Sequence, residues 1–161
     1  MTKDYIDRTG KWFLRPAIDG YVLKQGYDQT IEMGLIPDIP LMIGSNSEDS
    51  ATSTATDLQK AAKDWSLMRE EQGAKPLYIY YFTQQLLGDD AGAFHTAELW
   101  YTFETLERSW RPKRAEDYTL AHRMADHWTE FIKNWNPGWR PCTKEDPYVQ
   151  VLRCENAEKS V

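Results

Sequence analysis

One histidine of this chain stands in a glycine-rich loop that follows an apolar, aromatic run. The run is Leu77–Phe82 and the histidine is His95. A second loop, Gly44–Ser50, follows another apolar run and carries two neighbouring carboxylates, Glu48 and Asp49. An imidazole can take a proton from a hydroxyl, and a carboxylate beside it fixes the tautomer of the imidazole and stabilises its charged form. His95 is therefore a candidate general base, and one of the two carboxylates is its candidate orienting acid.

The nucleophile that such a pair would activate is missing from the sequence. A serine hydroxyl is a weak nucleophile unless a base activates it, and many hydrolases hold that serine on a tight Gly-x-Ser-x-Gly turn. Neither this pattern nor a glycine-rich loop for an oxyanion occurs in the 161 residues. The sequence thus predicts part of a hydrolytic site, in which the acid and the base are present and the serine is not.

The order of apolar runs and amphipathic segments predicts an α/β fold. Apolar runs, which are typical of buried parallel strands, occur at 39–44 and 77–82, and residues 146–152 resemble one more short strand. Apolar residues at helical spacing predict helices over 27–34, 57–72, 98–106 and 117–134. Asp19-Gly20 predicts a turn. No linker or repeat divides the chain, so we expect a single domain over residues 1–161.

Four segments, taken in order, resemble the signature segments of a known family. They are Arg15–Leu23, Ile39–Asp49, Gly92–Leu99 and Trp128–Pro137. The first resembles the pattern RPVxDGxxL, the second VPLLIGTNxDE, the third GAxHxxEL and the fourth WxxFAxxGxPN. Each segment alone is a weak signal, but their combination in this order is specific. The chain therefore resembles the C-terminal portion of the type-B carboxylesterases, the α/β-hydrolase family that includes the cholinesterases.

The resemblance implies a fold, a reaction and a set of roles. The fold would be the C-terminal part of an α/β-hydrolase, with a few mostly parallel strands packed against helices. The reaction would be hydrolysis of small-molecule carboxylic esters by a serine esterase with a catalytic triad and no cofactor. His95 would be the general base and Asp49, by register, the orienting acid; the family has Glu at that position, and Glu48 is the alternative. This chain alone would be inactive.

The missing serine leaves two functional hypotheses open. In the first, the serine lies upstream on the same gene or on a companion N-terminal chain, and this chain completes the esterase. In the second, the chain is a stand-alone, non-enzymatic remnant or an interaction domain on the esterase scaffold. Unpaired strand edges in a partial sheet predict self-association or a companion chain in either case.

Composition excludes several classes of partner. The net charge of −6 argues against nucleic acid as a partner, and no apolar run is long enough to span a membrane.

We expect a cytoplasmic protein without a signal sequence, in which Cys142 and Cys154 are reduced thiols rather than a disulfide. No pattern of cysteine and histidine residues predicts a metal site.

The remaining polar and aromatic candidates have ordinary structural interpretations. Asp89 and Asp90 could do acid–base work, but we expect solvated turn residues. His122 and His127 are interpreted as structural or solvated, although His122 could meet Asp126 one helical turn later. A cluster of aromatic residues could line a substrate pocket, but helical spacing favours packing; its members are Trp100, Tyr101, Phe103 and Trp110.

Overall fold

The computed structural model describes residues 17–49 and 55–154. Arg15 and Pro16 of the first signature segment and Ser50 of the loop Gly44–Ser50 therefore lie outside the described residues. Its helices and strands run in the order α2 (Tyr27–Glu32), β1 (Leu41–Asn46), α3 (Ala55–Glu71), β2 (Leu77–Phe82), α4 (Leu99–Thr102), the 3-10 helix η1 (Leu106–Arg108), α5 (Ala115–Asn134) and β3 (Gln150–Leu152). The chain divides into two compact units at Pro37 and Asp38. The expectation of one domain stays a prediction, and all candidate site residues belong to the second unit.

The first unit contains the predicted turn and helix α2. Asp19 Oδ1 accepts hydrogen bonds from the backbone N–H groups of Tyr21, Val22 and Leu23, at 2.9, 2.8 and 3.0 Å. These donors lower the pKa of the Asp19 carboxyl, because they stabilise its charged form. Gly20 takes a positive φ of 73°, which glycine adopts without steric cost. The turn predicted from Asp19-Gly20 is therefore present.

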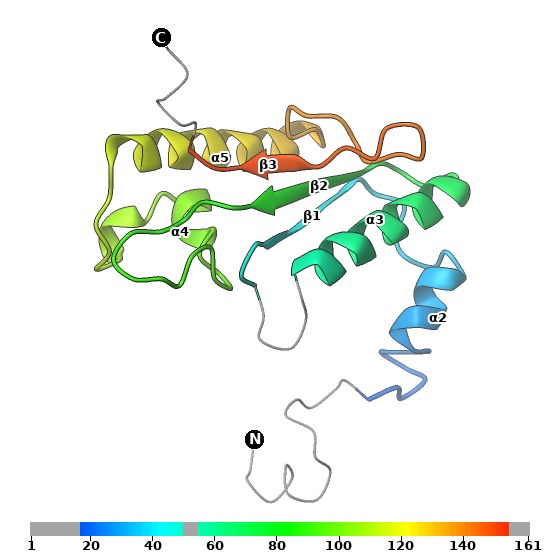
Figure 1. The fold of residues 1–161 in the computed structure, drawn as a ribbon. Helices are drawn as coiled ribbons and strands as arrows, with labels where there is room; N and C mark the ends of the chain where they lie inside the picture. The colour runs from blue at the N-terminus through cyan, green and yellow to red at the C-terminus, as the bar shows by residue number, and fades with distance from the viewer. Residues whose placement is uncertain (1–16, 50–54, 155–161) are drawn as a thin grey trace, which may run out of the picture. The chain divides into compact units, whose positions relative to one another are not determined.

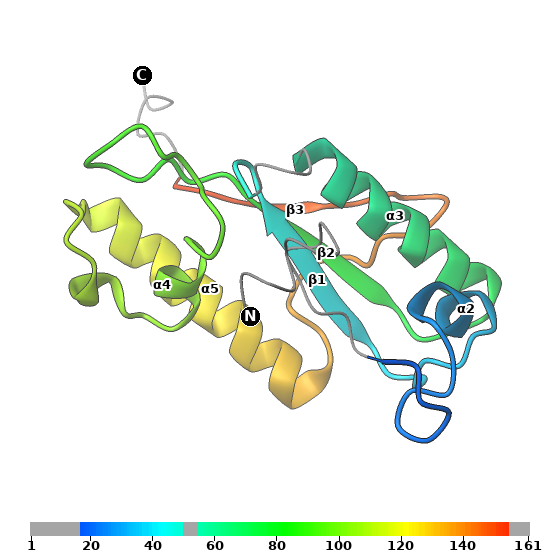
Figure 2. The same ribbon diagram turned by 90° about the horizontal axis from the view of Figure 1, so that it is seen from below.

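The second unit is built on a three-stranded parallel sheet in the order β1–β2–β3. Figure 1 and Figure 2 show α3 on one face of this sheet and α5 on the other, with α4 beside α5. The central strand β2 is largely buried on both faces, as expected for a parallel strand between two layers of helices. The predicted α/β class, with a small parallel sheet and packed helices, is confirmed.

Alternation along β2 divides the core into two clusters. Leu77 and Ile79 face α3, where they pack with Ala62, Cys142, Leu41, Ile43, Trp65 and Val149. Phe82 belongs to the larger cluster on the α5 side, with Leu86, Ala93, Ala97, Tyr101, Leu106, Leu120, Ala121, Met124 and Leu152. On this side, the Tyr80 ring covers Gly44 of the neighbouring strand, so closely that a Cβ at Gly44 would lie 2.4 Å from the ring.

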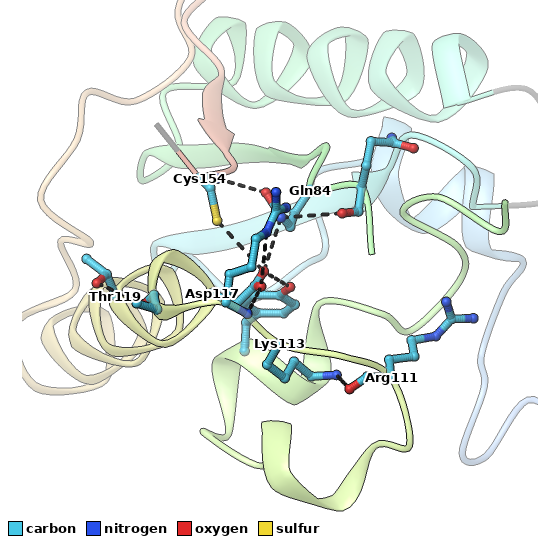
Figure 3. A network of polar contacts seen from close by, with 10 residues as sticks. Gln84, Arg111, Lys113, Asp117, Thr119 and Cys154 are labelled. Atoms are coloured by element: carbon cyan, nitrogen blue, oxygen red, sulfur yellow. Dashed lines mark hydrogen bonds and ion pairs between the residues drawn. The ribbon is translucent and has the colours of Figure 1, made fainter. Parts of the chain in front are cut away.

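A buried carboxylate at the start of α5 joins three segments of the second unit (Figure 3). Asp117 Oδ1 accepts hydrogen bonds from the Tyr101 hydroxyl (2.7 Å) and from Gln84 Nε2 (3.1 Å). Its Oδ2 accepts the backbone N–H of Arg114 at 2.9 Å, which caps the helix. Cys154 Sγ lies 3.8 Å from Oδ1, and its backbone N–H donates to Gln84 Oε1 at 2.9 Å. The network ties α5 to α4 and to the segment after β3.

Three predicted elements differ in extent from those observed. The helix predicted over 98–106 is wrong: α4 ends after Thr102, and Glu104 takes a positive φ of 51° before η1 begins. A left-handed residue cannot continue an α-helix. The strand predicted over 146–152 is shorter, because only Gln150–Leu152 pairs with β2. Helix α5 begins at Ala115, two residues before the predicted start at Asp117, and ends at the predicted residue, Asn134.

Candidate active site

The acid and the base lie just beyond the carboxyl ends of two neighbouring strands. Asp49 comes three residues after the end of β1, and His95 lies in the loop that follows β2. Because β1 and β2 are parallel and paired over their whole length, their carboxyl ends meet at one edge of the sheet. The loops beyond this edge of an open α/β sheet are where such folds place their sites.

His95 and Asp49 are in direct contact. The imidazole Nδ1 lies 2.5 Å from Asp49 Oδ1, although the two residues are 46 positions apart in the chain. Because a carboxylate can only accept, this contact assigns the proton to Nδ1 and leaves Nε2 as the acceptor. The His95 side chain is 75% exposed and that of Asp49 only 14%. The carboxylate of Asp49 is therefore largely shielded from solvent, while the imidazole of His95 is exposed.

Glu48, the alternative acid, holds the histidine loop by another route. Its Oε2 accepts the backbone N–H of Ala93 at 2.7 Å, and its own N–H donates to the Ala93 carbonyl at 3.1 Å. Glu48 and Phe94 form an isolated parallel bridge. Gly92 permits this approach, since its φ is +62° and a Cβ there would lie 2.8 Å from the Glu48 carboxyl carbon. The structure thus brings Asp49, and not Glu48, against the imidazole.

A buried arginine anchors the beginning of the histidine loop, a contact that the sequence analysis missed. Arg111 donates to both carboxylate oxygens of Asp89, at 2.5 and 2.6 Å, and to the carbonyl of Leu87 at 3.2 Å. Its guanidinium lies 5.1 Å from the ring centroid of Phe94 and 5.0 Å from that of Trp110. Asp89 is also a turn residue, as expected, because its Oδ1 accepts the backbone N–H of Ala91 at 3.0 Å and its side chain is 44% exposed; its pairing with Arg111 was not expected.

Asn46 and Glu98 also belong to this region and were not identified as site residues from the sequence. Asn46 ends β1 and is almost fully buried. Glu98 follows His95 by three positions and accepts a hydrogen bond from Asn46 Nδ2. Burial and the nearby charges of Glu98 and Asp49 raise the pKa of Tyr80, so its phenol stays neutral. Only the position of Glu98 inside the segment Gly92–Leu99 pointed to it.

The serine hydroxyls among the described residues bond to groups other than His95. Ser47 donates to Glu48, Ser66 donates to the carbonyl of Cys142 at 2.6 Å, and Ser45 accepts from Gln59 at 2.8 Å. Ser109 accepts the backbone N–H of Arg111 at 3.3 Å. No Gly-x-Ser-x-Gly occurs in the sequence either. The described residues thus supply the candidate acid and the candidate base, and none of their serine hydroxyls bonds to His95.

The other predicted candidates have structural partners. His122 Nδ1 contacts Glu104 rather than Asp126, and His127 Nδ1 lies 2.6 Å from the Pro137 carbonyl. Tyr101 is a core residue and Trp100 packs edge-on against Phe94, whereas the side chains of Phe103 and Trp110 are exposed. Cys142 and Cys154 are both free thiols, as expected.

Within residues 17–49 and 55–154, no three ligand-type side chains converge on a point where a metal ion could sit. In the same part of the chain, no helix has the length and apolar character needed to cross a bilayer.

Solved structures of esterases share this fold. The chain is similar to a PNB esterase (TM-score 0.69, 19% identity) and to a thermophilic PNB esterase (TM-score 0.71, 20% identity). It is also similar to the Geobacillus stearothermophilus carboxylesterase EST55 at pH 6.8 (TM-score 0.64, 16% identity). The matches cover 89%, 90% and 92% of this chain but only 40%, 41% and 42% of those chains. This chain therefore spans less than half the length of the esterases that it resembles.

The sequence itself matches one family model. No curated protein matches it. Residues 55–160 match the model of the carboxylesterase family, and this segment contains His95 but not Asp49. The match extends over more than half of the chain and includes the histidine loop, α5 and β3. Together with the sheet that brings His95 to Asp49, it leads to the conclusion that this chain belongs to the carboxylesterase family.

Proposed function

We propose that this chain is the acid-and-base part of a serine carboxylesterase, in which His95 is the general base and Asp49 the orienting acid. The observation that carries this proposal is the 2.5 Å contact between His95 Nδ1 and Asp49 Oδ1 at the carboxyl edge of the sheet. The serine and the oxyanion hole would come from residues outside this chain, on the same gene product or on a companion chain. The substrates would be small carboxylic esters.

The chemistry divides between the two side chains. Nε2 of His95 takes the proton of the serine hydroxyl as the serine oxygen attacks the ester carbonyl. Asp49 stabilises the imidazolium through Nδ1, and the imidazolium then gives its proton to the departing alcohol. In the second half, Nε2 takes a proton from water as the water oxygen attacks the acyl carbonyl, and the imidazolium then gives this proton to the departing serine oxygen, which releases the acid and restores the serine hydroxyl. Asp49 stays ionised throughout.

The proposal predicts which carboxylate matters. In the complete gene product, Asp49→Asn should lower kcat for a nitrophenyl ester by about 10⁴-fold, because asparagine favours the wrong imidazole tautomer. His95→Ala should abolish turnover. Glu48→Gln should keep most of the activity, since glutamine retains an oxygen that accepts the Ala93 N–H. Equal losses from Glu48→Gln and Asp49→Asn would contradict the assignment of the acid.

The location of the serine requires a separate experiment. An antibody against this chain would isolate the native polypeptide, whose intact mass and labelling by a fluorophosphonate would then be measured. A labelled polypeptide or complex well above 18.8 kDa supports the esterase. An unlabelled polypeptide of 18.8 kDa without a labelled companion would favour the stand-alone interaction domain. The 161-residue chain alone should hydrolyse the ester no faster than its His95→Ala variant.

A further inference from the structure

One buried asparagine is bonded to the acid and to both sides of the base. The backbone N–H of Asn46 donates to Asp49 Oδ2 at 3.1 Å. Its side-chain Nδ2 donates to the carbonyl of Phe94 at 2.7 Å and to Glu98 Oε2 at 2.5 Å. Phe94 precedes His95 in the chain and Glu98 follows it. Asn46 therefore links Asp49 to the residues on either side of His95.

The turn that carries His95 needs such support. The carbonyl of Phe94 also accepts the N–H of Ala97 at 3.0 Å, which closes a tight turn around His95. Thr96 inside this turn has a φ of 72°, an unfavourable conformation for a β-branched residue. Strained turns persist only where the surrounding structure holds them. The bonds from Asn46 Nδ2 hold this turn at both ends.

The burial of Asn46 makes the arrangement rigid. The residue is 1% exposed, so water cannot replace a bond that is lost. The bond to the Glu98 carboxylate is charge-assisted and therefore stronger than one between neutral groups. Asn46 also ends β1, which fixes its backbone by pairing with Phe82 of β2. The side-chain amide of Asn46 thus fixes the histidine turn relative to the carboxyl end of β1.

We infer that Asn46 and Glu98 are positioning residues, which hold His95 Nδ1 against Asp49 without touching substrate. The inference rests on the proposed esterase function. It concerns the geometry of the acid–base pair, however, and this geometry can be measured without turnover. Loss of the Asn46–Glu98 bond lets the turn relax, and the imidazole then samples orientations in which Nδ1 no longer faces the carboxylate.

The test follows the imidazole of His95 by NMR after labelling of histidine with ¹⁵N. In the wild-type chain, the Nδ1–H proton of His95 should be strongly deshielded, and His95→Gln identifies it against His122 and His127. Asn46→Ala and Glu98→Leu should lose this signal. Glu98→Gln should keep it, because its side-chain oxygen still accepts from Asn46 Nδ2. In the complete esterase, Asn46→Ala should lower kcat by about 10²-fold with little change in KM.

The control separates positioning from stability. Ser66 is buried and donates to the carbonyl of Cys142 at the other end of the sheet. Ser66→Ala should lower the melting temperature and leave the His95 signal intact. A wild-type His95 signal in folded Asn46→Ala, or the same spectrum for Glu98→Leu and Glu98→Gln, would overturn the inference. In the complete gene product, the predicted His95 signals without ester hydrolysis would instead overturn the proposed function and leave the positioning role supported.

Discussion

The buried carboxylate of Asp117 accepts hydrogen bonds from donors on several segments of the chain. Its partners include the Tyr101 hydroxyl, Gln84 Nε2 and the N–H of Arg114. Burial of the Cys154 thiol and, to a smaller extent, the negative charge of Asp117 raise the pKa of that thiol to about 11. Burial and the Asp117 carboxylate likewise raise the pKa of Tyr101. Both groups are therefore kept neutral at physiological pH.

The raised pKa of Cys154 predicts slow alkylation. Only the thiolate reacts, so at pH 8 a thiol with a pKa of about 11 should react about 100-fold more slowly than one of ordinary pKa. The rate for Cys154 with iodoacetamide, measured by peptide mass spectrometry, should keep rising up to pH about 11. Asp117→Asn should increase the rate near neutral pH, since it removes a negative charge. A plateau near pH 9 in the folded wild-type chain would contradict the prediction, and the urea-unfolded chain is the control.

At the residue scale, the sequence predicted the candidate acid and the candidate base but not the residues that hold them in place. His95 and Asp49 stand in motifs of distinctive composition, and the structure brings them together. Asn46, Arg111 and Glu98 act through contacts between segments far apart in the chain. Neither composition nor spacing could therefore assign their partners. Asp89 shows the same limit, because its turn was predictable but its arginine partner was not.

At the scale of elements, the Arg111–Asp89 pair predicts that acid loosens the histidine loop. Two bonds from Arg111 lower the pKa of Asp89 below its ordinary value of 3.8. A carboxyl with a lowered pKa stabilises the fold fully above its unfolded value, and this stabilisation is lost as pH falls through its folded value. Hydrogen exchange of the amides around Gly92 and Thr96, corrected for intrinsic rates, should therefore lose protection as pH falls from about 5 to about 2.

The matched variants for this loop are Asp89→Asn and Arg111→Leu. Asp89→Asn removes the charge at constant size, so its loop should exchange fast already at neutral pH and show little further change in acid. Arg111→Leu should behave in the same way around the loop while α3 keeps its protection. Full protection of the loop in Asp89→Asn would show that Arg111 holds it through the Leu87 carbonyl and the aromatic rings alone.

The elements that the sequence predicted well are those with a long apolar repeat or a continuous apolar run. Helices α3 and α5 and strands β1 and β2 are close to their predicted bounds, because their apolar residues repeat over several turns or form a continuous run. The predicted helix over 98–106 was wrong, since the backbone of Glu104 has a positive φ although the apolar residues around it have helical spacing. The end of α4 depends on tertiary contacts such as that of Glu104 with His122.

For the whole molecule, the open sheet predicts association of the chain when it is alone. In the described residues, β1 and β3 are the outer strands, and outer strands present unpaired backbone groups to other chains. Exposed apolar side chains of the second unit add to this: Ile39, Leu87, Leu99, Phe103, Trp110, Ile132, Trp135 and Val151. The chain also spans about 40% of the length of a PNB esterase with this fold.

Sedimentation velocity over a range of concentrations tests this association. The 161-residue chain should form dimers or larger species as its concentration rises. Met42→Lys places a charge on β1, and charges on an outer strand oppose pairing between sheets. This variant should therefore remain monomeric to higher concentration. A wild-type chain that stays a monomer and melts cooperatively would show that its edges are already covered.

The bridge between Glu48 and Phe94 has a consequence for how this protein can vary. It continues the parallel pairing of β1 and β2 into the two loops, so the separation of Asp49 and His95 is set by the spacing of adjacent strands. The connection between the strands, which includes α3, does not set that separation. Insertions or deletions in this connection, in evolution or in design, can therefore reshape the molecule around the site while the acid and the base keep their alignment.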